Sequence, residues 1–197
     1  DKKFNYLFLS SVYWTFFQEI NINDECDYCI LSWLKENSNS TTILLSLELH
    51  RYIEEQPNIY YSDFSINNDE DILFRNIKIL SSLSRKLIIL EPFPTMSVYK
   101  LSPREILLAK TKVSNIKQIY IPYQDWINNT TKTNAFYKKI KFENNKIDFV
   151  KTSDIFCRPS SDKCIVYEYP DLYYLDNVHL TTEGANLVIY ELEKYLK

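Results

Sequence analysis

Glycine is almost absent from this chain of 197 residues, in which Gly184 is the single example. Phosphate-cradling loops of the P-loop or dinucleotide-binding type need several glycines, so the composition excludes both kinds of nucleotide site. Positive charge is not in excess either, because the net charge is -3. A nucleic-acid-binding surface usually requires clustered positive charge. We therefore expect no nucleic acid among the partners.

Long hydrophobic runs are missing as well. No segment approaches the roughly 18 consecutive apolar residues of a membrane-spanning helix. Hydrophobic residues make up 45% of the chain and charged residues 25%, which is ordinary for a globular protein. The length predicts one domain over residues 1–197 that is large enough to bury a full core.

What the chain does contain is an alternation of short apolar runs with amphipathic stretches. The runs predict strands at Asn5–Ser10, Thr42–Leu49, Lys86–Leu90 and Lys146–Val150. The amphipathic stretches predict helices at Asp27–Lys35, Asp69–Ser84, Asn134–Lys141 and from Ser102 to about Val113, while Ile116–Tyr123 fits a strand or a loop. Nearly continuous apolar strands are typical of parallel sheets covered on both faces. Because hairpin dipeptides such as Asn-Gly are absent, we predict an α/β fold with a mainly parallel sheet.

The most informative stretch precedes a predicted helix that runs to the end of the chain. Asp176 lies three residues before His179, and Gly184 falls near the start of that helix. A carboxylate at this spacing can accept the Nδ1 proton of the imidazole and leave Nε2 to take a proton from a hydroxyl. The alternative is a half-buried histidine beside an ordinary turn aspartate. Since glycine costs about 1 kcal/mol inside a helix, Gly184 predicts a close approach by a neighbouring strand or loop.

Residues 176–185, DNVHLTTEGA, resemble the last sequence block of the SGNH hydrolase superfamily. They resemble more narrowly the SGNH domain at the C-terminus of membrane acyltransferase-3 proteins. In those proteins a cysteine pair, here Cys157 and Cys164, and a tyrosine, here Tyr174, come before the block. Thr41–Tyr52 and Arg85–Pro94 are similar to two of the family's strands. The resemblance spans nearly the whole chain and implies a three-layer α/β/α sandwich of the SGNH or flavodoxin-like type.

The resemblance also implies a function: acyl transfer to or from hydroxyl groups on the extracytoplasmic or lumenal face of a membrane. In the implied Ser-His-Asp mechanism, His179 is the general base and Asp176 orients it. The implied partners are an acyl donor, a hydroxyl-bearing acceptor (carbohydrate or lipid) and the membrane-embedded acyltransferase domain of the parent protein. No metal or organic cofactor is required. Because the family's Gly-Asp-Ser nucleophile block does not occur in this chain, we expect an SGNH-like domain that starts after that block.

Other interpretations stay open. The chain could be a non-catalytic binding module on an SGNH scaffold. It could also be a metal-dependent hydrolase with Asp176 and His179 as ligands, although the further ligands of such a site are missing. Ser10 and Ser11 follow an apolar run in the way that a nucleophile follows a first strand, but no Gly-Asp precedes them.

Three polar residues follow predicted strands and are candidates to line a pocket. His50 and Arg51 lie in a segment that resembles an active-site loop of the family, and Glu91 ends a strand before two prolines. The alternative for His50 and Arg51 is a solvent-facing strand end, and for Glu91 a helix-cap acceptor.

The cysteines and the sequons bear on the compartment. In a lumenal or extracellular domain, the spacing of Cys157 and Cys164 in a polar loop suits a disulfide. Cys26 and Cys29 have Cys-x-x-Cys spacing, and a four-cysteine zinc site is the alternative to separate or bridged thiols. Asn-x-Ser/Thr triplets, which are glycosylation acceptors in secreted proteins, occur at Asn39, Asn128 and Asn129.

Overall fold

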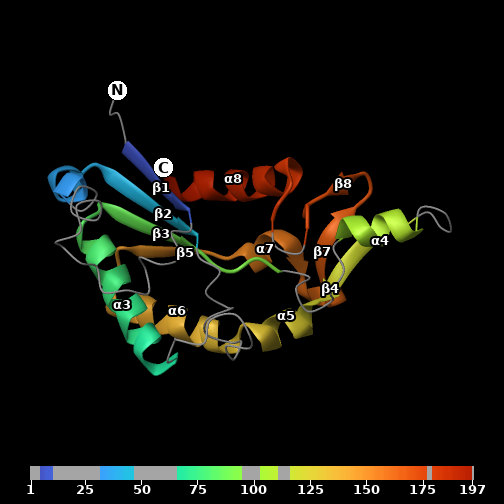
Figure 1. Ribbon diagram of the computed structural model, residues 1–197, viewed down its shortest axis with the longest axis horizontal. Coiled ribbons are helices and arrows are strands. Elements are labelled where there is room, and N and C mark those ends of the chain that lie inside the picture. The colour runs from blue at the N-terminus through green and yellow to red at the C-terminus, as the bar shows by residue number, and fades with distance from the viewer. Residues whose placement is uncertain are drawn as a thin grey trace. The chain divides into compact units, whose positions relative to one another are not determined.

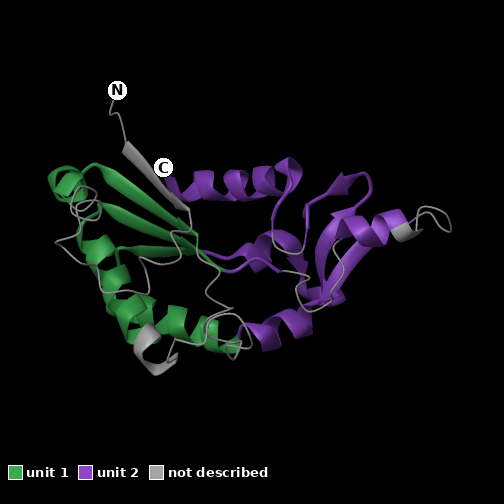
Figure 2. Cartoon of the chain, in the orientation of Figure 1, with its two compact units in different colours: residues 1–91, 131–149 green, residues 92–130, 150–197 purple. Residues whose placement is uncertain are grey.

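The computed structural model of the chain (Figure 1) describes residues 5–10, 32–46, 66–94, 103–110, 116–176 and 179–196. The chain divides into two compact units (Figure 2). The first contains residues 1–91 and 131–149, and the second contains residues 92–130 and 150–197. The expectation of a single domain over residues 1–197 stays a prediction.

The first unit contains a parallel sheet. Strands β1 (Asn5–Ser10), β2 (Thr41–Ser46) and β3 (Lys86–Leu90) run parallel, and the sheet order is β1-β2-β3-β5, with β5 at Ile147–Val150. The expected α/β fold with a parallel sheet is therefore confirmed. The strand expected at Thr42–Leu49 corresponds to β2, and its residues 47–49 lie outside the described ranges.

Helices cover one face of this sheet. Helix α3 (Ile66–Ser82) and helix α6 (Thr131–Glu143) pack against the strands, and a shorter helix spans residues 32–37 (Figure 1). Side chains alternate between the two faces of a strand, so every second strand residue enters the same core. That core is formed by Leu34, Ile43, Leu45, Leu73, Ile77, Leu80, Leu87, Ile89, Phe136, Tyr137, Ile140, Ile147 and Phe149. The intervening β3 residues Ile88 and Leu90 are also buried, as expected of a strand covered on both faces.

The second unit contains an antiparallel sheet that the sequence did not predict. Its order is β4-β7-β6, with β4 at Gln118–Pro122, β7 at Lys163–Glu168 and β6 at Cys157–Arg158. The short strand β8 (Asp171–Leu172) also pairs with β7. The expected polar loop around the cysteines is thus partly strand. Between β6 and β7 the chain turns through a 3₁₀ helix, Pro159–Ser161, and through Asp162 at a φ of 53°. Aspartate tolerates this left-handed conformation, so no Asn-Gly signal marks the hairpin.

The remaining helices follow the sequence in part. Helix α4 (Pro103–Lys110) lies within the helix expected from Ser102 to about Val113, whereas α5 (Tyr123–Asn129) and α7 (Thr152–Phe156) were not predicted. Helix α8 (Thr182–Leu196) buries Val188 and Leu192. Ile189, the residue after Val188, is 53% exposed. Among the helices that the structure describes, none is both long and apolar enough to cross a membrane.

Candidate functional site

Thr181 caps the helix beside the candidate site. Its backbone carbonyl accepts a hydrogen bond from Ala185 at 2.9 Å, and its hydroxyl accepts one from the backbone N–H of Gly184 at 3.2 Å. The same hydroxyl donates to the carbonyl oxygen of Leu172, and the Thr181 N–H donates to that of Tyr173 at 3.0 Å. A threonine is favoured at an N-cap because its oxygen satisfies a backbone N–H that has no partner within the helix. Thr181 therefore joins the start of α8 to the segment that follows β8.

Between Tyr173 and Thr181 the chain folds back as a short hairpin. Tyr174 and Leu180 form an antiparallel bridge, and the N–H of Leu175 donates to the carbonyl oxygen of His179 at 2.8 Å. The hairpin brings Asp176 and His179 together. Backbone hydrogen bonds on both sides thus fix the positions from which these two side chains extend.

Asp176 contacts His179 with both carboxylate oxygens. Oδ1 accepts the backbone N–H of His179 at 2.8 Å, and Oδ2 lies 2.7 Å from Nδ1 of the imidazole. With Nδ1 occupied in this way, Nε2 is the nitrogen that remains for a substrate proton, and no described residue hydrogen-bonds it. The side chain of His179 is 73% exposed, so a reacting hydroxyl could approach Nε2 from solvent. The arrangement can hold one tautomer of the imidazole and present it as a base.

The other residues singled out from the sequence fall in different places. His50, Arg51, Ser11, Cys26 and Cys29 lie outside the described residues. Ser10 ends β1, of which the structure describes the backbone. Half-buried Glu91 follows β3, and its charge adds to burial, the larger cause, in raising the pKa of Tyr137. The expected sequon residues Asn39, Asn128 and Asn129 are all exposed. The roles expected for these residues stay predictions.

Cys157 and Cys164 form a disulfide. They lie opposite each other in the register of β6 and β7, rather than in the polar loop that was expected from the sequence. Both are buried, so the bond ties the two strands together within the interior of the second unit.

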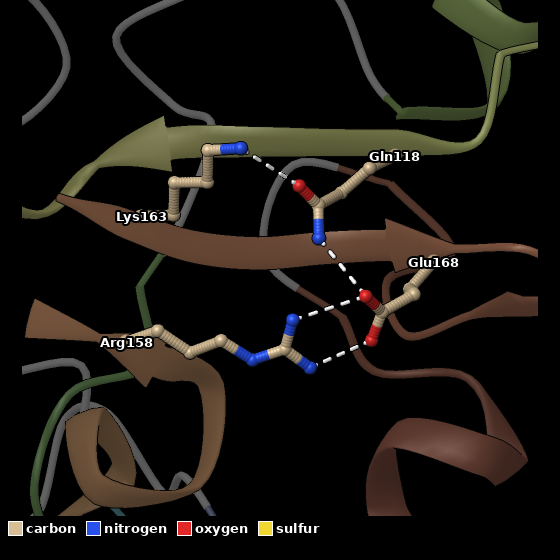
Figure 3. Close-up of polar contacts among 4 residues, drawn as sticks. All are labelled: Gln118, Arg158, Lys163 and Glu168. Atoms are coloured by element: carbon tan, nitrogen blue, oxygen red, sulfur yellow. Dashed lines mark hydrogen bonds and ion pairs between the residues drawn. The ribbon is translucent and has the colours of Figure 1, made fainter. Parts of the chain in front are cut away.

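Sequence reasoning missed a chain of polar side chains on this sheet (Figure 3). Arg158 donates two hydrogen bonds to the carboxylate of Glu168, at 3.0 and 2.7 Å. Gln118 donates to the same carboxylate at 3.0 Å and accepts from Lys163 at 3.1 Å. The hydrogen bond from Arg158 is the main cause of the lowered pKa of Glu168. No local signal could have revealed the group, because it depends on the register that places Gln118 opposite Glu168 and Arg158 opposite Lys163.

Tyr173 links this polar group to the candidate site. Its backbone carbonyl supports Thr181, while its side chain lies near Arg158 and Glu168. Burial is the first cause of the raised pKa of Tyr173, and the charge of Glu168 is the second. The next residue, Tyr174, is fully buried against Phe156, with ring centroids 5.5 Å apart, and burial raises its pKa well above the ordinary value.

A family model described as the SGNH domain fused to AT3 domains matches residues 11–194. The chain belongs to this SGNH family. The match includes the Asp176–His179 hairpin and most of both units, which confirms the resemblance inferred from the sequence. The SGNH domain described here is accordingly a module associated with acyltransferase domains, and such a fusion implies a membrane protein as its parent.

Comparisons with individual proteins add little to the family assignment. No curated protein matches the SGNH chain. Among solved structures, one named as a platelet activating factor from Streptococcus pneumonia is similar, with 16% sequence identity and a TM-score of 0.47. That match covers 85% of this chain and 68% of the other. A TM-score below 0.5 does not establish a shared fold, so the fold assignment rests on the strand pairing itself.

Proposed function

We propose that the chain is the extracytoplasmic SGNH domain of a membrane O-acyltransferase that moves acyl groups to or from hydroxyls. The observation that supports this most directly is the contact between Oδ2 of Asp176 and Nδ1 of His179 at 2.7 Å. It is the arrangement that a triad base requires, because the carboxylate sets the tautomer and stabilises the imidazolium that forms. Membership of a family fused to acyltransferase domains supports the same chemistry.

In the proposed reaction, a serine hydroxyl attacks the carbonyl carbon of an acyl donor. A bond forms from the serine oxygen to that carbon while the proton passes to Nε2 of His179. The imidazolium, stabilised by Asp176, then gives its proton to the departing oxygen as the donor ester breaks. The acceptor hydroxyl resolves the acyl-serine by the same steps in reverse, and its proton passes through Nε2 to the serine.

The serine of this mechanism is proposed to lie outside residues 1–197, because no Gly-Asp-Ser block occurs among them. The acceptor is a hydroxyl-bearing carbohydrate or lipid, and the partner is the membrane acyltransferase domain. The disulfide between Cys157 and Cys164 supports an extracytoplasmic location, since such bonds persist in oxidising compartments.

The test is acyl transfer by the parent membrane protein with three variants. His179→Ala should reduce turnover by several orders of magnitude, as loss of a triad base does. Asp176→Asn should reduce it strongly as well, because an amide does not fix the same tautomer. Glu193→Gln, at an exposed position on helix α8, is the control and should keep full activity. Full turnover in His179→Ala would show that the pair is structural.

A second readout separates the arrangement of the pair from the catalytic role. Imidazole ¹⁵N shifts in the chain should report the Nδ1–H tautomer of His179, and Asp176→Ala should shift the population toward Nε2–H. If the tautomer responds in this way but acyl transfer does not, the dyad exists without catalysing the reaction.

The absence of Gly-Asp-Ser from this sequence also favours a second candidate, a non-catalytic binding module on the SGNH scaffold. This candidate predicts that His179→Ala leaves turnover of the parent protein within a few fold of normal and weakens retention of the acceptor. Calorimetry of the acceptor with the isolated wild-type chain and with its His179→Ala variant discriminates between the two candidate functions.

A further inference from the structure

The outward face of helix α6 carries a group of lysines around one exposed aromatic ring. The helix buries Thr133, Phe136, Tyr137 and Ile140 on the opposite face. Its exposed lysines are Lys132, Lys138, Lys139 and Lys141. Phe142 is 93% exposed, the largest exposed fraction of any large hydrophobic side chain in the part of the chain that the structure describes.

Helical spacing makes this a single surface. Residues three and four positions apart are neighbours on a helix, so Lys138 and Lys139 both flank Phe142. Lys141, the residue before Phe142, projects about 100° around the helix axis from it and lies at one edge of this surface. Lys132 lies about two turns before Lys139 on the same side of the helix. A phenylalanine alone on a surface needs no explanation, but an exposed aromatic ring beside several lysines offers both apolar insertion and charge attraction to an anionic membrane surface.

The positive charge of this face is mostly uncompensated. Glu143, the one acidic residue of α6, lies 2.6 Å from Nζ of Lys78 on α3. Lys139 has a looser acidic neighbour, Glu70 at 3.8 Å. Among the described residues, Lys132, Lys138 and Lys141 have no acidic partner. The net charge of -3 for the whole chain conceals this local excess.

We propose that the outward face of α6 docks on a membrane surface that carries anionic lipid headgroups. The lysines attract the headgroups, and Phe142 enters the boundary between headgroups and acyl chains. Juxtamembrane lysines are drawn to anionic leaflets in this way, and an aromatic side chain adds apolar burial that salt does not screen. The parent of this family is a membrane protein, so such a surface is within reach of the domain. The proposal does not depend on the proposed acyl transfer.

The test is co-sedimentation of the chain with phosphatidylglycerol-containing vesicles and with pure phosphatidylcholine vesicles. The chain should bind the anionic vesicles and not the neutral ones. Lys138→Glu with Lys141→Glu should weaken binding by on the order of tenfold or more, because each lysine near an anionic leaflet contributes a several-fold factor. The charge-matched control is Lys35→Glu with Lys117→Glu, two exposed lysines outside α6, and it should change binding by less than about threefold.

Phe142→Ser isolates the apolar part of the docking surface. It leaves the charge unchanged and, at an exposed position, should leave the thermal unfolding midpoint unchanged. It should remove the binding that persists in high salt, which headgroup attraction alone cannot supply. The proposal is overturned if the chain ignores anionic vesicles, if the control pair weakens binding as much as the α6 pair, or if a DNA duplex competes as well as the vesicles do.

Discussion

Gly184 lies directly against the backbone of Tyr173. A β-carbon on Gly184 would overlap the carbonyl oxygen of Tyr173 and lie 3.0 Å from its carbonyl carbon. The group that would be overlapped is a backbone carbonyl, and it also accepts a hydrogen bond from the N–H of Thr181. The backbone of Tyr173 therefore cannot move away without disturbing the hairpin of Asp176 and His179. The close approach explains why the one glycine of the chain is kept inside a helix.

Gly184→Ala should therefore destabilise the protein. Alanine would gain about 1 kcal/mol in helix propensity, but overpacking against a fixed backbone costs about 1–3 kcal/mol. The net loss should appear as a lower midpoint in urea, together with altered backbone amide shifts of His179. Ala185→Gly, which loses propensity and adds no overlap, is the control and should leave those shifts in place. An alanine variant more stable than the wild type would show that the contact relaxes easily.

The disulfide between Cys157 and Cys164 provides a second test. In the chain-entropy model, closing so short a loop contributes about 2–3 kcal/mol to the free energy of unfolding. Reductant should therefore lower the urea midpoint of the wild type and leave that of a Cys157→Ala, Cys164→Ala variant unchanged. Mass spectrometry of the unreduced protein should find the cross-linked peptide. Two free thiols in protein from an oxidising compartment would count against both the bond and the proposed location.

The strands that the sequence predicts are those long enough to show a hydrophobic pattern of their own. Strands β2 and β3 are continuous apolar runs, so their burial pattern is visible in the sequence itself. The strands β6 and β8 have two residues each, which is too short to show any period. Only pairing with β7 makes them strands, and that pairing is a property of the folded chain.

The same distinction applies to the candidate site. Asp176 and His179 are three residues apart, so a turn alone brings them together, and the sequence could predict their contact. Arg158 meets Glu168 across two strands, and Gln118 reaches the same carboxylate from fifty residues away. The exposure of Phe142 could not be predicted from the sequence, because apolar and basic residues both lie beside it in the chain. Only its position on helix α6 shows that the ring faces solvent.

The ion pair of Arg158 and Glu168 should contribute stability with a defined pH dependence. Because its pKa is lowered in the folded state, Glu168 stabilises the protein above its unfolded pKa, and the contribution is lost as the pH falls through the folded pKa. The side chains are 53% and 37% exposed, so solvent screening keeps the effect below about 1 kcal/mol. Arg158→Ala should be less stable than the wild type at pH 7, and the difference should shrink toward acid pH. A difference that grows below the pKa of glutamate would contradict the assignment.

The buried hydroxyl of Tyr174 leads to the last prediction. The side chain is 1% exposed, and the hydroxyl has no hydrogen-bond partner among the described residues. A buried polar group without a partner costs about 1–3 kcal/mol, so Tyr174→Phe should leave the free energy of unfolding unchanged or raise it by up to that amount.

The Tyr174→Phe variant should also change how the free energy of unfolding depends on pH in the alkaline range. Burial raises the pKa of the folded tyrosine, so above about pH 10 the unfolded chain ionises first and stability falls with rising pH. Urea unfolding between pH 8 and 11 should therefore show a shallower loss for Tyr174→Phe, while Tyr190→Phe, at a position that is 68% exposed, should follow the wild type. A Tyr174→Phe variant that is less stable by about 1–2 kcal/mol at pH 7 would instead reveal a hydrogen bond from this hydroxyl, and the hydroxyl would then belong to the support of the Asp176–His179 hairpin.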